Sequence, residues 1–343
     1  MTTVFDKKEN CSGCGVCKAV CNQNAVVMQR DDCGFYYPKI DAKRCISCGK
    51  CRDNCHFINK SVSRNLFEKV YAVQSRDEEV LKKSQSGGAF AELAKSILNS
   101  GGAAYGAAFN ELFEVCHIRI DSVNQLHRLQ GSKYVQSKTE DIFEKVKNDL
   151  DNDLKVLFSG TPCQVAALYS YLGQRRESLY TVDIVCHGVM PPTLWKDYID
   201  RMTDKYGKIA CADFRDKSYG WKSHNETFVI GGQKIKKNVY RKIFYKNILL
   251  RPSCYSIKKD RYITACKYAG MSRVSDITIG DFWGIQSETD VFKNSNLGIS
   301  LCIVNTQSGI RLFERLKQNV IWEQRDISEA SAKQPHLSRS DDG

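Results

Sequence analysis

The residues most able to do chemistry in this chain are its cysteines. The sequence holds 16 of them, and nine lie before residue 56. Eight of those nine form two repeats of one spacing, C-x2-C-x2-C-x3-C: Cys11, Cys14, Cys17 and Cys21, then Cys45, Cys48, Cys51 and Cys55. Three thiolates on one tight loop, with a fourth shortly after it, suit the corners of a cubane cluster. The spacing therefore predicts two [4Fe–4S] clusters.

The pattern also predicts how the ligands are shared. In bacterial ferredoxins, where this run occurs, the fourth cysteine of each repeat ligates the other cluster. We therefore expect a first cluster on Cys11, Cys14, Cys17 and Cys55, and a second on Cys45, Cys48, Cys51 and Cys21. The proline that usually follows the fourth cysteine is replaced by Asn22 and His56, which leaves the ligand set intact. Cys33 matches no ligand position and is expected to be a free thiol.

Disulfides and structural zinc are the alternatives for so many cysteines. Disulfides persist in oxidising compartments, and the polar, acid-containing start of the chain is unlike a secretory leader. Structural zinc usually takes two separated C-x2-C pairs, and gives no reason for a third cysteine at the same spacing. No stretch reaches the ~18–20 apolar residues of a membrane-spanning helix. We therefore expect a cytoplasmic protein with no membrane span.

The charge balance points to acidic partners other than nucleic acid. There are 51 Lys and Arg against 39 Asp and Glu, a formal net charge of +12. The basic residues are spread along the chain without a long block, and cluster thiolates would add negative charge that this count omits. A basic surface attracts acidic cofactors or acidic protein partners. The oligomeric state does not follow from the sequence.

Cysteine density divides the chain into two domains. A ferredoxin-like domain with two [4Fe–4S] clusters fits residues 1–60, and the polar segment 61–69 is expected to be a linker. Residues 70–330 alternate strand and helix signals, which is typical of a domain with a substantial sheet. Residues 331–343 are expected to be a polar tail. The predicted fold class is α+β, with the two-cluster ferredoxin domain followed by an α/β domain built on a mixed sheet.

The sequence of the larger domain predicts core cysteines, strands and helices. Three cysteines in strand-like apolar runs are expected in the core: Cys116, Cys211 and Cys302. Strands are expected at 70–75, 103–109, 115–120, 156–160 and 180–188, and helices at 88–98, 140–150, 164–172 and after residue 192.

Six phrases of the larger domain resemble one family. In order they are SQSGGAF (84–90), GSKYVQS (131–137), LFSGTPCQVAAL (157–168), VDIVCHGVMPP (182–192), FRDKSYGW (214–221) and SDITIGDFWGI (275–285). Behind the cysteine repeats, they resemble the coenzyme F420 hydrogenase/dehydrogenase beta-subunit family over nearly the whole chain. The resemblance implies a flavin-binding oxidoreductase domain that exchanges electrons among clusters, FAD and a deazaflavin or similar two-electron substrate. Members with this arrangement are often encoded beside bacterial surface-polysaccharide genes.

The resemblance implies a set of cofactor-binding residues. Ser86, Gly87 and Gly88 precede a helix, whose N-terminal N–H groups suit a flavin diphosphate; tight packing is the structural alternative. Lys133 and Tyr134 suit an anionic reduced flavin, or else belong to a surface loop. Two more candidates, at a strand-to-helix turn, are Gly160 and Thr161, the latter also able to cap the helix.

Four later cysteines could form a further site. Cys163 and Cys186 end neighbouring strands, and Cys254 and Cys266 follow. Relatives often carry the later pair as C-x2-C, whereas eleven residues separate them here, as if by an insertion. Convergence of all four would allow a third cluster; the alternative is that Cys163 and Cys186 line a flavin pocket without metal. In that pocket Cys163, Cys186 and His187 are the candidate catalytic residues, since an imidazole titrates near neutrality.

Two redox functions remain open, besides a metal-stabilised interaction protein whose clusters are structural. The first is an iron–sulfur flavin-dependent oxidoreductase that relays electrons between clusters and a flavin, with coenzyme F420 or a polysaccharide-pathway molecule as acceptor. The second is a non-catalytic electron-transfer subunit that docks on a partner enzyme. The direction of electron flow is open in both.

Overall fold

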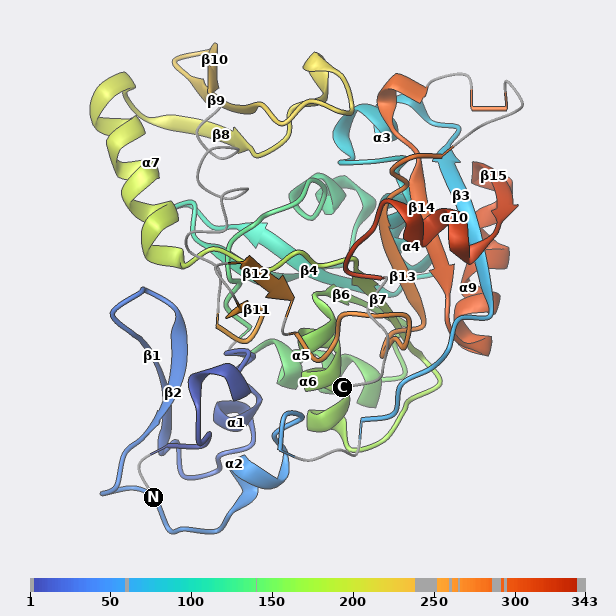
Figure 1. The fold of residues 1–343 in the computed structure, drawn as a ribbon. Helices are drawn as coiled ribbons and strands as arrows, with labels where there is room; N and C mark the ends of the chain where they lie inside the picture. The colour runs from blue at the N-terminus through green and yellow to red at the C-terminus, as the bar shows by residue number, and fades with distance from the viewer. Residues whose placement is uncertain are drawn as a thin grey trace.

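The architecture comes from a computed structural model. It describes residues 3–58, 62–139, 141–237, 252–258, 261–264, 266–285, 291–292 and 295–337. A small N-terminal unit, blue in Figure 1, lies beside a larger unit built on one broad sheet. Within the described residues, no helix is both long enough and apolar enough to cross a bilayer.

The N-terminal unit repeats one local design. The two short helices α1 (Val16–Ala19) and α2 (Lys50–Asp53) each start after a left-handed glycine, Gly15 at φ 79° and Gly49 at φ 78°. Between the repeats runs an antiparallel hairpin of β1 (Val26–Arg30) and β2 (Tyr36–Ile40). A 3-10 turn, η1 (Lys8–Asn10), precedes the first repeat. Cysteines and small apolar side chains share its core, which suits a unit held by thiolate-ligated groups rather than by apolar burial alone.

The large sheet has eight strands in the order β15-β3-β14-β13-β7-β6-β4-β5. Its central strands β13, β7, β6 and β4 are parallel, and the outer pairings are antiparallel. The mixed sheet predicted from the sequence is confirmed. The bounds are β3 Lys69–Ser75, β4 Ala103–Phe109, β5 Val115–Ile120, β6 Val156–Gly160, β7 Leu179–Ile184, β13 Ile277–Asp281, β14 Ser300–Val304 and β15 Val320–Arg325.

Helices cover both faces of this sheet. One core joins α4 (Ala89–Leu98) and α9 (Gln307–Leu316) to it, with α3 (Glu78–Lys83) nearby. The other face carries α5 (Ile142–Asp151) and α6 (Pro162–Leu172), and α1 of the N-terminal unit packs against both. Short 3-10 turns join elements at η2 Val123–Arg128, η3 Lys217–Tyr219, η4 Ser295–Leu297 and η5 Lys317–Asn319.

A third group of elements lies at the edge of the sheet. Helix α7 (Pro192–Tyr206) packs on a three-stranded sheet, β10-β9-β8, through a separate aromatic core. The strands are β8 Ile209–Asp213, β9 Glu226–Ile230 and β10 Gln233–Lys237. A further hairpin, β11 (Tyr255–Lys258) with β12 (Arg261–Thr264), and a last helix, α10 (Ile327–Ala332), complete the described elements.

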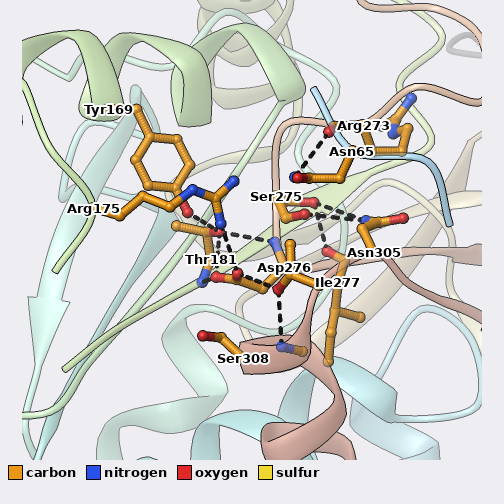
Figure 2. A network of polar contacts seen from close by, with 12 residues as sticks. Asn65, Tyr169, Arg175, Thr181, Arg273, Ser275, Asp276, Ile277, Asn305 and Ser308 are labelled. Atoms are coloured by element: carbon orange, nitrogen blue, oxygen red, sulfur yellow. Dashed lines mark hydrogen bonds and ion pairs between the residues drawn. The ribbon is translucent and has the colours of Figure 1, made fainter. Parts of the chain in front are cut away.

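A buried carboxylate ties the middle of the sheet together (Figure 2). Asp276 is buried and accepts bonds from the Thr181 backbone N–H and hydroxyl, both at 2.8 Å, and from the Thr306 hydroxyl at 2.6 Å. Arg175 lies 3.4 Å from the same carboxylate. Because these partners come from β7, from the start of α9 and from the loop after α6, one side chain fixes three elements.

Several expectations need correction. The strand expected at 180–188 ends at Ile184, because the chain leaves the sheet there and turns at Gly188, φ 98°. Cys211 is exposed on β8 rather than in the core, and Cys116 is only half-buried; Cys302 is buried as expected. The expected polar tail 331–343 is packed as far as it is described, since the C-terminal segment places Leu337 in the core. The remaining residues of that tail lie outside the described residues.

Candidate functional site

The first predicted cluster set comes together at the inner side of the N-terminal unit. Cys17 lies close enough to Cys11, Cys14 and Cys55 to interact electrostatically with all three. Burial raises the pKa of the Cys17 thiol, so a thiolate here requires compensating positive charge. Cys14 interacts in addition with Cys163 of the larger domain. The four predicted ligands are therefore neighbours, and they adjoin the second domain.

The second predicted set lies further out. Cys51 interacts with Cys21 and Cys45, and Cys48 is exposed. Both repeats share one backbone shape: Gly13 and Ser47, at matched positions, have φ of 65° and 56°. A serine in this left-handed region is uncommon, which shows how closely the second loop follows the first.

The third candidate set also converges. Cys186 interacts electrostatically with Cys254, Cys163 and Cys266. The residues between the later pair, which looked like an insertion, form the β11–β12 hairpin with Tyr255 opposite Thr264. The hairpin therefore folds back on itself and returns the chain to its starting point, which brings Cys254 and Cys266 together despite their spacing.

The surroundings of the sulfurs fit iron–sulfur ligation. Among the described residues, no three His, Cys, Asp or Glu side chains are placed to hold a single metal ion; a cubane is larger, and its ligands stand further apart. Backbone N–H groups donate to the cysteine sulfurs at 3.3–3.4 Å, from Gly13 to Cys11, Ala25 to Cys21, Gly188 to Cys186 and Tyr268 to Cys266. Such bonds stabilise cluster thiolates and tune their potential.

One cavity of about 290 Å³ connects these features. It is lined by Cys14 from the first set and by all four cysteines of the third set. The predicted cofactor residues on its wall are Ser86, Gly88, Lys133, Tyr134, Gly160 and Thr161. Its volume is at the lower end of the ~300–1,000 Å³ usual for ligand pockets. Residues predicted separately from the sequence thus share one wall.

In the SGG turn Ser86 and Gly88 lie on the wall, whereas Gly87 does not line the cavity and has a packing role. A side chain at Gly87 would overlap the Val73 carbonyl oxygen, and Gly88 adopts φ 84°. Ser86 donates to the Ile299 carbonyl at 2.8 Å. Among the described residues no side chain caps the first turn of α4, and Gly88, Ala89 and Phe90 at its start line the cavity.

Lys133 lies on the cavity wall, where its ammonium group already has hydrogen-bond acceptors within the protein. Its ammonium donates to the carbonyls of Gln130 and Arg128 at 2.7 and 3.1 Å. Burial lowers the pKa of Lys133 to about 7. Tyr134 lies beside the aromatic ring of Phe214. This lysine is a cavity residue rather than the surface residue of the alternative interpretation.

Thr161 fulfils the structural alternative. It forms a capping box with Gln164, whose side chain accepts from the Thr161 N–H at 2.9 Å. Its hydroxyl also lies 3.1 Å from the Cys163 sulfur. A side chain at Gly160 would lie 2.9 Å from Gln164 Oε1, so the glycine is needed for this tight turn. Both residues therefore hold Cys163 in place.

His187 is half-buried and lies against a buried second histidine that the sequence reasoning missed. The rings of His187 and His336 lie 4.3 Å apart in an edge-on contact. His336 comes from the segment expected to be a tail, so no local pattern pointed to it. His117 was also missed; it lines the cavity from β5, where only its apolar neighbours were noticed.

A polar and aromatic cluster adjoins the cavity, which its members Asp281 and Trp283 line. Arg215 donates to Asp281 at 2.6 Å, and the Trp221 indole donates to the other oxygen of that carboxylate at 2.7 Å. Trp221 stacks on Trp283 with ring centroids 4.9 Å apart. These residues lie in two of the quoted phrases, FRDKSYGW and SDITIGDFWGI, but their pairing is visible only in three dimensions.

Comparison with known proteins supports the family and the fold. A family model that describes the C-terminal part of the beta subunit of coenzyme F420 hydrogenase/dehydrogenase matches residues 153–330, just over half of the chain. A subunit of the F(420)H(2) dehydrogenase of Methanosarcina mazei is 24% identical over 168 residues, 46% of this chain and 47% of that protein. The chain therefore spans about half the length of this relative.

Two further comparisons concern a short segment of the sequence and the overall fold. Over 45 residues the chain is 47% identical to a subunit of the Na(+)-translocating ferredoxin:NAD(+) oxidoreductase complex of Acetobacterium woodii, which is 13% of this chain and 12% of that protein. A chain of the xenon-derivatised F420-reducing [NiFe] hydrogenase complex from Methanosarcina barkeri superposes with a TM-score of 0.50 at 16% identity, over 77% of this chain and 84% of that one. At that identity the likeness concerns the fold alone.

Proposed function

Because the chain belongs to the coenzyme F420 hydrogenase/dehydrogenase beta-subunit family, we propose that it is an iron–sulfur flavoprotein oxidoreductase. Electrons pass between the N-terminal clusters and a flavin in the cavity, by way of a third cluster on Cys163, Cys186, Cys254 and Cys266. The expected two-electron partner is coenzyme F420 or a similar deazaflavin, with a polysaccharide-pathway molecule as the other candidate. The name of the M. mazei relative favours the deazaflavin.

The observation that carries this proposal is the shared cavity. Cys14, a ligand of the inner N-terminal set, lies on the same wall as the four later cysteines and interacts with Cys163. A pure carrier needs only its clusters at the surface. A cavity that continues from them to an uncapped helix end and a half-buried lysine has the parts of a cofactor site.

Each part of the wall has a physical task. The uncapped N–H groups of α4 and its dipole suit the diphosphate of FAD. The positive charge of Lys133 favours a reduced, anionic flavin ring nearby. A bound flavin would exchange single electrons with clusters and pairs of electrons with a small-molecule partner. Trp283 lines the cavity and stacks on the buried Trp221, and this pair would help to exclude water from that exchange.

The composition of anaerobically purified protein tests the proposal. Iron, sulfide and extracted flavin are quantified per chain for the wild type and for Cys186→Ser. Three clusters give about twelve irons per chain and two give about eight, so the variant is expected to drop from the first value to the second. Cys211→Ser changes an exposed cysteine and is the matched control, expected to keep about twelve irons.

The same measurement separates the two functions. One flavin per chain supports the enzyme; full iron without flavin would leave the non-catalytic electron-transfer subunit as the better description. Wild-type protein with about eight irons would remove the third cluster from the proposal. Reduction of the bound flavin by reduced coenzyme F420, followed by its absorbance, then tests the partner.

A further inference from the structure

The two cysteine repeats have the same backbone but opposite surroundings. Val16 and Lys50 occupy equivalent positions; Val16 is 1% exposed and packs with the core under α5 and α6, whereas Lys50 is exposed. Ser12 and Ile46 are likewise equivalent. Ser12 lines the cavity and lies 3.3 Å from His56, whereas Ile46 is 65% exposed. One loop is therefore built to face inward and the other to face outward.

The outward loop, residues 42–50, combines the features of a docking surface. It carries the exposed ligand Cys48 beside Ile46, a large apolar side chain in water. Three exposed basic residues flank them in the sequence: Lys43, Arg44 and Lys50. The acids nearest in sequence are Asp41, which lies 3.4 Å from Arg44, and Asp53 at the end of α2. The loop itself carries three positive charges and no negative one.

We propose that loop 42–50 is the docking surface for an acidic one-electron carrier protein, which exchanges electrons with the outer cluster. The inference rests on the proposed function and adds the partner's chemistry and its point of contact. An iron–sulfur cluster takes one electron at a time, so the carrier must be a one-electron donor or acceptor. Basic residues around an apolar centre match an acidic carrier with an apolar patch over its own redox group.

The proposed step transfers one electron, and no bond is made or broken. The carrier loses one electron, the outer cluster gains it, and no proton or leaving group is involved. The electron then moves to the inner cluster, whose ligands adjoin the cavity. Two such events supply the electron pair that a deazaflavin requires. Reversal of every step would serve electron export through the same surface.

Stopped-flow reduction of the anaerobic holoprotein tests this surface. The probe is a reduced small acidic [2Fe–2S] ferredoxin, and cluster absorbance reports electron arrival. The triple variant Lys43→Glu, Arg44→Glu, Lys50→Glu should lower the second-order rate constant by about 10-fold or more at low ionic strength, since steering by charge contributes about 10–10³-fold. It should also reverse the salt dependence of the rate constant. Added salt slows the wild-type reaction because it screens attraction, and should speed the reaction of the variant because it screens repulsion. Ile46→Ser should slow the reaction at all ionic strengths.

A matched control separates local docking from net charge. The exposed residues Arg201, Lys205 and Lys208 lie near the end of α7, far from the N-terminal unit in Figure 1. Their replacement by Glu makes the same change in net charge. If this control slows the reaction as much as the triple variant, or if the triple variant reacts at the wild-type rate, the docking proposal is wrong.

Two more readouts keep the outcomes distinct. Iron content and the final extent of reduction by excess dithionite must match the wild type in every variant. Wild-type protein that lacks iron, or that dithionite does not bleach, contradicts the proposed function itself and not the choice of surface. A third outcome would assign the loop to a membrane surface and overturn the proposal. In that outcome the wild type binds anionic phospholipid vesicles and the triple variant does not, while both react with the ferredoxin at the same rate.

Discussion

Replacement of His117 tests whether the cavity wall is built around a neutral imidazole. The ring is 6% exposed. Its Nε2 lies 3.0 Å from the Ser159 carbonyl, which only accepts, so Nε2 carries the proton. Nδ1 lies 2.8 Å from the Ser137 hydroxyl and accepts from it. Both ring nitrogens are satisfied in the neutral form. Burial accordingly lowers the pKa of His117 from 6.5 to about 4.

The sign and size of the effect follow from these two values. The folded state holds the ring neutral to lower pH than the unfolded chain, so stability is full above pH 6.5 and is lost as the pH falls toward 4. A pKa that differs by one between the folded and unfolded states corresponds to about 1.4 kcal/mol. Linkage then gives a loss of about 2 kcal/mol from this residue between pH 7.5 and pH 5, and about 3 kcal/mol once both states are protonated.

Denaturant unfolding of anaerobic holoprotein at pH 7.5 and pH 5 measures this loss. His117→Gln keeps a donor and an acceptor but does not titrate, so its stability should fall by about 2 kcal/mol less than that of the wild type over this range. His127→Gln, at an exposed histidine, is the matched control. Equal pH dependence of wild type and His117→Gln would show that the ring is not held neutral, and would refute the reasoning.

Two further predictions concern the scaffold of the site. Asp276→Ala should lower the free energy of unfolding by about 3–5 kcal/mol in chemical denaturation, because its buried partners lose their acceptor; Asp32→Ala, at an exposed position, should change it by less than about 0.5 kcal/mol. Gly87→Ala should lower the melting temperature by several degrees or prevent folding, since its methyl group would overlap the Val73 carbonyl. Unchanged stability in either buried variant would contradict the corresponding contact.

Elements fixed by local pattern were predictable from the sequence. Strands β4, β5 and β6 have the expected bounds, because their apolar runs are short and are flanked by glycine or polar residues. Helix α6 starts two residues before the expected 164, since Pro162 takes the first helical position and Thr161 caps it. The spacing of the two repeats also indicated which cysteines would lie near one another: Cys17 lies near Cys11, Cys14 and Cys55, and Cys51 near Cys21 and Cys45.

Other parts of the site depend on distant segments and could not be predicted. The convergence of Cys254 and Cys266 depends on a hairpin whose pairing is visible only in the fold. His336 reaches the cavity because the C-terminal segment crosses it, held where Gln334 donates to the Asp281 carbonyl. The composition of that segment predicted a polar tail. In the structure, however, three of its side chains are buried: Gln334, His336 and Leu337.

The residue that replaces a common proline explains how the first domain is joined to the second. His56 is 1% exposed; one ring nitrogen faces Ser12 of the first repeat, and the other hydrogen-bonds the Tyr268 hydroxyl, two residues after Cys266. Lys267 donates to the His56 carbonyl. A proline would fill the same turn but offer neither ring nitrogen. The substitution therefore exchanges a local turn constraint for a contact between two cysteine-bearing segments. That contact holds the inner repeat against the cavity and leaves the outer repeat to the solvent.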